Sequence, residues 1–402
     1  MALVNFSFDG IKTEIQCLKE DKMKNICIKY ASKIDKDINS LYFLYNGNKI
    51  NYELTYYKQA NSIDKRRLEM NILVFINGDL NLKKELKQNI NRQNSDNLYD
   101  NFDIMVKKPI LIINVHKNSI CCSTVLNDGR IATSSYDKSI IIYNNKTFKP
   151  DLIIKEHTGP VYYILLLSSG MLASCSNDKT IKIFNIKNNN YEVLQTLNYH
   201  KYSVFKIIEL RNKKLVSCSS DSSIIVYSKY NNNKYTKDYQ ISTNGSSHCV
   251  IQTKDNEICY YENNKYSICF FDLLERKIIN NINKIIFINV GHGYNFFNMI
   301  TKDLLLITGT DKLYIINVIQ HNLIRIINVP DSWYINVSCM LNKNTILTGG
   351  SNGKIKQWRI EKDNLKLIST KENAHHENIF SIIKLGDGHI LSGSEEGIIK
   401  IW

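Results

Sequence analysis

Histidine and aspartate, two of the three residue types of a hydrolytic triad, recur in this 402-residue chain at one fixed spacing. His157 stands 21 residues before Asp178, and His200 stands 21 residues before Asp221. Serines accompany them, so the pattern suggests nucleophilic catalysis, in which a histidine activates a serine hydroxyl. A catalytic set normally occurs once, however, whereas this spacing occurs in several places along the chain. We therefore expect these side chains to hold loops in place by hydrogen bonds.

Other signatures of a reaction centre are absent from the sequence. There is no phosphate-binding G-x-x-x-x-G-K-[ST] loop and no G-x-S-x-G turn. His375 and His376 have no third ligand at zinc spacing, and the ten cysteines form no C-x-x-C pair. Free buried cysteines behave as small apolar side chains, so we expect reduced thiols inside a cell. The sequence predicts a protein that is not an enzyme, with no catalytic residue, no cofactor and no bound metal.

The residues that would position these side chains belong to a repeat of seven copies. One acidic or amide residue marks each copy, and successive copies lie 41 to 47 residues apart: Asp137, Asp178, Asp221, Asn264, Asp311, Asn352 and Glu396. An aromatic residue follows six positions later in every copy except the fifth, which has Asn317. The last copy, residues 379–402, reads as three strands separated by tight turns. Such a meander cannot bury its own faces, so it requires neighbours.

The repeat resembles the WD40 family, most clearly in MLASCSNDKTIKIFNI (171–186), ILTGGSNGKIKQW (346–358) and HILSGSEEGIIKIW (389–402). This resemblance implies a ring of four-stranded blades, one for each copy. It also implies a hydrogen-bonded set inside a blade, made of a loop histidine, a strand serine or threonine, a turn aspartate and a strand tryptophan. The matching positions are His157, Ser174, Asp178 and Phe184, with phenylalanine in place of the indole; His200 and Asp221; and His375, Ser392, Glu396 and Trp402.

The ends of the repeat region are expected to meet. The last copy has three strands, and the run ILIINV at 110–115 precedes the first histidine without a blade of its own. We expect this run to complete the final sheet and hide its edge.

The resemblance also indicates where a partner could bind. In WD40-like propellers, side chains near the start of the first strand and just before the turn aspartate face the narrow rim of the channel. Aromatic residues, which are favoured at interface hot spots, occupy several of these places, with burial between blades as the alternative: Tyr136, Tyr162, Phe205, Tyr334 and Phe380.

The first 77 residues have a different organisation. A hairpin with a turn at Asp9, a helix for which Asp21 is a plausible N-cap, a strand at 41–45 and a last strand at 69–76 follow one another. On this element order, its length and the turn in FLYNGNKI, the segment looks like a ubiquitin-like (β-grasp) domain. The resemblance implies an outer apolar patch that includes Leu44, unless Leu44 is simply a half-exposed sheet residue. No Gly-Gly end follows Ile76, so we expect a fixed module and not one that is conjugated to other proteins.

The expected fold class is mainly β: a seven-bladed WD40 β-propeller at residues 109–402, preceded by a small α+β ubiquitin-like β-grasp domain at residues 1–77. Residues 78–108 are rich in Asn, Lys and Asp and are predicted to form a linker with a short helix. We see no secretory signal and no apolar run long enough to span a bilayer. We expect an intracellular, cytoplasmic monomer, with the nucleus as the alternative compartment.

The net charge of +14 raises the question of a nucleic-acid or anionic-membrane partner. The lysines are scattered, no RNA-binding signature appears, and the chain is rich in Asn, Lys, Ile and Tyr together, so we attribute the charge to composition. The leading hypothesis is a protein-interaction scaffold whose propeller rim binds a protein or peptide and whose ubiquitin-like module binds a second partner. The alternatives are a substrate-recruiting component of the ubiquitin or proteasome system and an RNA-associated propeller of a ribosome or splicing assembly.

Overall fold

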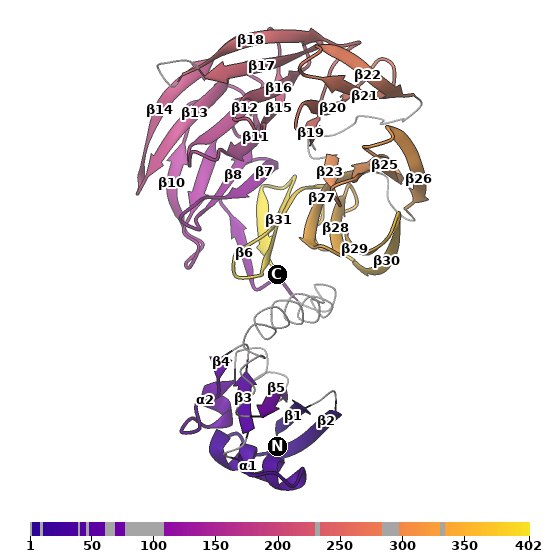
Figure 1. Cartoon of the computed structure of the whole chain (residues 1–402). Coiled ribbons are helices and arrows are strands. Elements are labelled where there is room, and N and C mark those ends of the chain that lie inside the picture. The colour runs from indigo at the N-terminus through magenta and orange to yellow at the C-terminus, as the bar shows by residue number, and fades with distance from the viewer. Residues whose placement is uncertain are drawn as a thin grey trace. The chain divides into compact units, whose positions relative to one another are not determined.

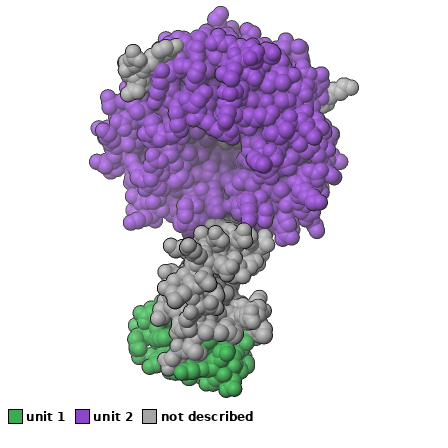
Figure 2. Space-filling model, in the orientation of Figure 1, with its two compact units in different colours: residues 1–102 green, residues 103–402 purple. Residues whose placement is uncertain are grey.

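The computed structural model describes residues 2–8, 11–38, 41–45, 48–60, 69–76, 108–229, 234–283, 297–329 and 334–402. The chain divides into two compact units, residues 1–102 and 103–402 (Figure 2). Apart from Lys108, the predicted linker at 78–108 lies outside the described residues.

The first unit contains a five-stranded sheet in the order β2-β1-β5-β3-β4 (Figure 1). Its strands are β1 (Ala2–Phe8), β2 (Ile11–Cys17), β3 (Leu41–Tyr45), β4 (Asn48–Lys49) and β5 (Glu69–Ile76). Strands β1 and β5 run parallel, and the other neighbouring pairs are antiparallel. The alternation of the sequence puts Val4 and Phe6 on one face of β1, and both are fully buried.

Helix α1 (Met23–Lys33) shares a core with this sheet. Its apolar residues recur at helical spacing, and Met23, Ile26 and Tyr30 are buried. The Tyr30 ring stacks on Phe6 with the ring centroids 4.2 Å apart, and Phe43 meets Tyr30 edge-on at 6.0 Å. The side chain of Leu44, in β3, lies outside the described part of the structure.

Two local features of this unit differ from the sequence prediction. The N-cap of α1 is Lys22, while the carboxylate of Asp21 accepts a hydrogen bond from the Leu18 amide at 2.9 Å. A short second helix, α2 (Tyr56–Gln59), begins after Thr55, whose hydroxyl accepts a hydrogen bond from the Lys58 amide. The sequence predicts no element there because four residues carry too little periodicity.

The second unit is a ring of seven four-stranded antiparallel blades (Figure 1). The first three blades are β7 (Ile120–Val125), β8 (Ile131–Ser135), β9 (Ile140–Tyr143) and β10 (Pro150–Ile154); β11 (Val161–Leu166), β12 (Leu172–Ser176), β13 (Ile181–Lys187) and β14 (Asn190–Leu197); and β15 (Val204–Glu209), β16 (Leu215–Ser219), β17 (Ser223–Lys229) and β18 (Tyr235–Ser242).

The fourth to seventh blades are β19 (Val250–Lys254), β20 (Glu257–Glu262), β21 (Ser267–Asp272) and β22 (Lys277–Ile282); β23 (Phe297–Met299), β24 (Leu304–Thr308), β25 (Lys312–Asn317) and β26 (Asn322–Asn328); β27 (Ile335–Asn342), β28 (Thr345–Gly350), β29 (Ile355–Glu361) and β30 (Asn364–Lys371); and β31 (Ile379–Lys384), β32 (Ile390–Ser394), β33 (Ile398–Ile401) and β6 (Leu111–Asn114). The prediction of a mainly β, seven-bladed propeller is confirmed.

Strand β6 supplies the fourth strand of the last blade. It pairs antiparallel with β33, so that Leu111 faces Ile401 and Ile113 faces Ile399. The Ile110 amide extends the ladder by donating a hydrogen bond to the Ile401 carbonyl at 2.7 Å. The polypeptide therefore crosses from the last blade directly into β7 of the first.

Apolar cores lie between neighbouring blades and hold the ring together. One cluster joins the last and first blades through Ile113, Ile120, Ile141, Leu391 and Ile399. The first strands β7, β11, β15, β19, β23, β27 and β31 contact one another in this order around the ring, and β31 contacts β7. Each blade thus buries faces that it could not bury alone.

Candidate functional site

The repeated histidines and aspartates form matching hydrogen-bonded sets in the first three blades. In the second blade, His157 Nδ1 lies 2.7 Å from Asp178 Oδ2, and His157 Nε2 lies 2.6 Å from Ser174 Oγ. The third blade repeats this arrangement with His200, Asp221 and Ser217 at 2.9 and 2.7 Å. These bonds join the loop that enters each blade to the turn after its second strand, and we call the face of the ring formed by these loops and turns the loop end.

The carboxylates of these sets are stabilised in their charged form. Burial alone would raise the pKa of Asp178, but hydrogen bonds from His157 and Thr180 hold that pKa well below its usual value. In the third blade, burial again raises the pKa of Asp221, but hydrogen bonds from His200 and Ser223 lower it by more. The sets are therefore strong, charge-assisted links across each blade.

The geometry does not support the hydrolytic use of these residues. Ser174 and Ser217 are fully buried, and His157 and His200 are buried as well. A substrate carbonyl cannot reach either serine hydroxyl without unfolding the blade, so the sets hold the loop end together.

The last blade departs from this pattern. His375 Nε2 lies 2.8 Å from Ser392 Oγ, as expected, but Glu396 does not accept a hydrogen bond from His375. Its carboxylate instead accepts one from Ser394 at 3.3 Å, and His375 Nδ1 is buried without a hydrogen-bond partner. Burial, with Lys400 and His376 nearby, lowers the pKa of His375 to about 3, so this imidazole is neutral. The longer glutamate side chain does not reproduce the position of an aspartate carboxylate.

Two tryptophans at the aromatic position add a further bond to the second strand of their blade. Trp402 Nε1 donates to Ser392 Oγ at 2.8 Å, and in the sixth blade Trp358 Nε1 donates to Thr348 Oγ1 at 2.9 Å. Phe184, which has no polar atom, is fully buried among the apolar side chains of the first two blades.

The five candidate rim residues divide into two groups. Phe380 is fully buried, and Tyr162 and Phe205 are 7% and 8% exposed, so these three side chains lie between blades and do not form an open surface. Tyr136 and Tyr334 are half-buried. The Tyr162 ring lies 5.5 Å from both the Tyr136 and the Phe205 ring centroids, which places a rigid aromatic support behind Tyr136.

Tyr202 is the most exposed of the described aromatic residues at the loop end, and the sequence did not predict it as a rim residue. Tyr202 is 61% exposed and lies two residues after His200, on the loop that leads into β15. The Lys179 ammonium lies 5.7 Å from the centre of its ring. Tyr202 occupies no repeated aromatic position, so a search by repeat offset could not find it.

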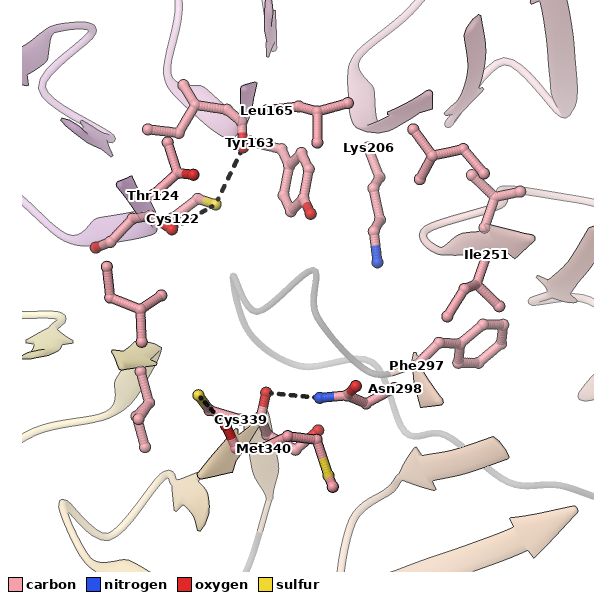
Figure 3. Close-up of a pocket in the computed structure, with 17 residues that line it drawn as sticks. Cys122, Thr124, Tyr163, Leu165, Lys206, Ile251, Phe297, Asn298, Cys339 and Met340 are labelled. Carbon is pink, nitrogen blue, oxygen red and sulfur yellow. Dashed lines mark hydrogen bonds between the residues drawn. The ribbon is translucent and has the colours of Figure 1, made fainter. Parts of the chain in front are cut away.

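A second feature that sequence reasoning missed is a cavity of about 350 Å³ in the central channel. In Figure 2 the visible face of the propeller is hollowed at its centre, and Figure 3 shows side chains from the first strands around this space. Cys122, Tyr163 and Lys206 belong to β7, β11 and β15 and lie six residues after His116, His157 and His200. The sequence repeat could have indicated these residues, because they lie one position further along each strand than the repeat position that contains Tyr162 and Phe205.

In the part of the chain that the structure describes, the remaining titratable groups do not form a metal centre. Within the described ranges, His, Cys, Asp and Glu side chains form no group of three or more that could hold a metal ion. All ten cysteines are free thiols, and nine are buried. No helix among the described residues has the length and apolar character needed to cross a membrane.

Comparison with protein families identifies the repeat. The family model described as WD domain, G-beta repeat matches residues 107–144 and 148–185, which contain His116 and Asp137 and then His157 and Asp178. No curated protein matches the chain.

Proposed function

Because the chain carries WD40 repeats in a seven-bladed propeller, we propose that it is a non-enzymatic scaffold that binds a protein or peptide segment at the loop end. WD40 propellers typically act as protein-interaction scaffolds, which supports the proposal. The buried serines and histidines of the blade sets support it as well, because they are positioned to stabilise the loops and not to meet a substrate.

The observation that carries the proposal is the group of accessible aromatic side chains at this end. Tyr202 is mostly exposed, and Tyr136 and Tyr334 are half-buried. Tyrosine offers a large apolar face and a hydroxyl at little cost in conformational entropy, and such residues are enriched at interface hot spots. The support of Tyr136 by Tyr162 reduces the ordering needed on binding.

For the first unit, we propose a ubiquitin-like module that binds a second partner, within a chain divided into residues 1–77, a linker at 78–108 and the propeller at 109–402. The central parallel pair β1–β5, with α1 packed on the sheet through Tyr30, supports this part of the proposal. Two binding modules on one chain would raise the effective concentration of one partner near the other. Leu44 remains a candidate contact of this module.

The test is affinity capture with a double variant, Tyr136→Ala with Tyr202→Ala. We expect proteins that bind the intact chain to be lost, because the variant removes two aromatic contacts at the loop end while leaving the blade sets intact. The matched control is Leu274→Ala with Ile319→Ala. These exposed apolar residues lie in the turns β21–β22 and β25–β26, at the opposite end of the ring, and the control should retain the captured proteins.

Equal capture by the intact chain, the double variant and the control would contradict binding at the loop end. Repeating the capture with residues 108–402 assigns each partner to a unit, because proteins that need the first unit are lost from this shorter chain.

A further inference from the structure

Ten of the 17 residues that line the cavity in the central channel fall into two layers. The layer six residues after each loop histidine includes Cys122, Tyr163 and Lys206. The layer two residues further along each strand is mostly apolar and consists of Thr124, Leu165, Ile208, Ile251, Asn298, Cys339 and Ile383. Two residues along a strand span about 7 Å, so a polar layer and an apolar layer follow each other along the channel.

Lys206 is an unbalanced charge in the first of these layers. Its side chain points into the cavity (Figure 3), yet the residue is only 4% exposed. Its ammonium donates to Cys249 Sγ at 3.3 Å and lies 5.4 Å from the centre of the Tyr163 ring. No carboxylate is among the described residues that line the cavity. A lysine ammonium has three donors, and a thiol is a weak acceptor, so most of its hydrogen-bonding capacity is unused.

The surroundings of Lys206 keep it charged despite this burial. Burial by itself favours the neutral amine, whereas the hydrogen bond to the Cys249 sulfur and the contact with the Tyr163 ring favour the ammonium and raise the pKa of Lys206. A buried charge without an opposite charge is costly, and an anion that entered the cavity would relieve this cost.

We propose that the central channel is a binding site for an organic carboxylate with an apolar body, whose carboxylate pairs with Lys206 and whose body contacts the apolar layer. The single lysine balances one negative charge. A phosphate dianion would leave a net negative charge in the channel, so the carboxylate is the better match. Leu165, Ile208 and Ile251 provide the apolar contacts, and the cavity volume lies within the range of about 300–1,000 Å³ that is usual for small-ligand sites.

The experiment titrates sodium hexanoate into the full chain with 13C-labelled methionine methyl groups. Met340 lines the cavity and reports on the site, whereas Met23 is buried in the first unit and reports on unspecific effects. Assignment uses a Met340→Leu variant. We expect a saturable shift of the Met340 signal with no shift of the Met23 signal. Acetate should bind more weakly, since each buried methylene improves affinity by up to about fourfold.

Lys206→Met tests the charge, because methionine keeps an unbranched stem as far as Cε and removes the ammonium. We expect hexanoate binding to weaken by at least about tenfold, the usual effect of losing a charge-assisted hydrogen bond. The matched control is Lys182→Met, whose lysine on β13 donates to Thr196 outside the channel, and it should bind as the unmodified chain does. Hexanol supplies a test without any substitution, because it has the same body without the charge and should bind far more weakly than hexanoate.

The carboxylate could belong to a peptide chain terminus or to a free small acid. These two sources are distinguished with a short peptide that ends in a free leucine and with the same peptide carrying an amidated end. A Met340 shift with the free peptide alone indicates a chain terminus, and a shift with hexanoate alone indicates a free small acid. Equal binding of hexanoate and hexanol, unchanged binding to Lys206→Met, equal shifts of Met340 and Met23, or tighter binding of inorganic phosphate than of hexanoate would each overturn the proposal.

Discussion

Asp178 accepts four hydrogen bonds, and this number makes it the link between two loops of the second blade. The donors are His157 Nδ1, the Thr158 amide, and both the amide and the hydroxyl of Thr180, at 2.6 to 3.0 Å. Replacement by alanine would leave the buried His157 Nδ1 without this partner and would remove the bonds from Thr158 and Thr180. We expect Asp178→Ala to lower the free energy of unfolding by about 1–3 kcal/mol, measured by chemical denaturation.

The control for this substitution is Asp255→Ala. The Asp255 side chain is 79% exposed and makes one surface ion pair with Arg211, so its loss should change stability by less than about 0.5 kcal/mol. Similar effects of the two substitutions would mean that the blade set contributes nothing to stability.

Glu396→Asp is expected to stabilise the last blade. The residues that follow the turn aspartates, Lys138 and Lys179, have φ values of 72° and 74°, and Gly397 has 77°, so the turn backbone already matches that of the first two blades. An aspartate at this position should therefore accept a hydrogen bond from His375 Nδ1, which has no partner beside Glu396. We expect a gain of about 0.5–1.5 kcal/mol in the free energy of unfolding.

The pH dependence of stability checks the same substitution independently. His375 has a pKa of about 3 in the folded chain and about 6.5 when unfolded, so between these values the unfolded state binds a proton that the folded state does not. The burial of His375 therefore costs no stability above pH 6.5, and the free energy of unfolding falls as the pH falls from 6.5 towards 3. Glu396→Asp should raise the folded pKa of His375 and make the decline of the melting temperature between pH 6.5 and 4 shallower. An unchanged decline would show that His375 gains no partner.

The adjacent tyrosines 162 and 163 show what a repeat period cannot tell. The period places both in the first strand of the second blade, but Tyr162 packs against Tyr136 and Phe205, whereas Tyr163 lines the cavity. A shift of one residue exchanges the two faces of a strand. A register irregularity between Val161 and Tyr163 disturbs the count at this point, and it recurs between Val204 and Lys206. The spacing from the histidine therefore predicts which strand a residue belongs to but not on which face of that strand its side chain lies.

At the level of elements, β6 contributes to the propeller through one side of a four-residue strand. Ile113 is 8% exposed and packs in the core shared by the last and first blades, whereas its neighbour Ile112 is 56% exposed. We expect Ile113→Ala to lower the free energy of unfolding by about 2–4 kcal/mol, because it removes buried methyl groups and leaves a cavity. Chemical denaturation of the full chain measures the effect.

Ile112→Ala is the matched control, since it makes the same chemical change on the opposite face of β6. Its effect should be smaller than about 0.5 kcal/mol. A larger effect of Ile112→Ala than of Ile113→Ala would show that β6 turns the other face towards the core.

Elements defined by long periods could be predicted from the sequence, whereas those set by local side-chain contacts could not. The fifth copy lacks the aromatic residue and has Asn317 instead, yet it forms a blade because its strands keep the apolar runs of the repeat. In the fourth blade, Glu262 accepts a hydrogen bond from the Asn244 amide at 3.1 Å, a link that no repeated spacing indicates. The same limit explains why the N-cap of α1 and the short helix α2 were missed.

The propeller as a whole is a ring in which the backbone crosses the junction between the last blade and the first. Strand β6 pairs with β33 and then continues into β7. Separating these two blades therefore requires breaking a β-ladder in addition to the contacts between β31 and β7. At the other junctions the chain likewise passes from the fourth strand of one blade into the first strand of the next.

A circular permutant can remove this ladder from the junction without changing any buried side chain. Joining Trp402 to Ile110 by a short loop and opening the chain between Asn114 and Val115 makes the last blade one continuous stretch. The new loop can be short because the Ile110 amide already bonds to the Ile401 carbonyl. We expect this permutant of residues 110–402 to form the same blades, by circular dichroism, but to melt at a lower temperature, since side-chain packing alone would join its last and first blades.

A second permutant separates the loss of the ladder from the effect of moving the chain ends. It carries the same new loop but opens between Asn188 and Asn189, in the turn between β13 and β14. Its first strand, β14, then pairs with its last strand, β13, so that the second blade combines both ends as the last blade does in the natural order. We expect this permutant to melt close to the unpermuted propeller. Two outcomes would contradict this expectation: equal melting temperatures of the two permutants, or a first permutant that is as stable as the propeller in its natural order. Either outcome would show that side-chain packing alone closes the ring and that the pairing of β6 with β33 adds nothing to its stability.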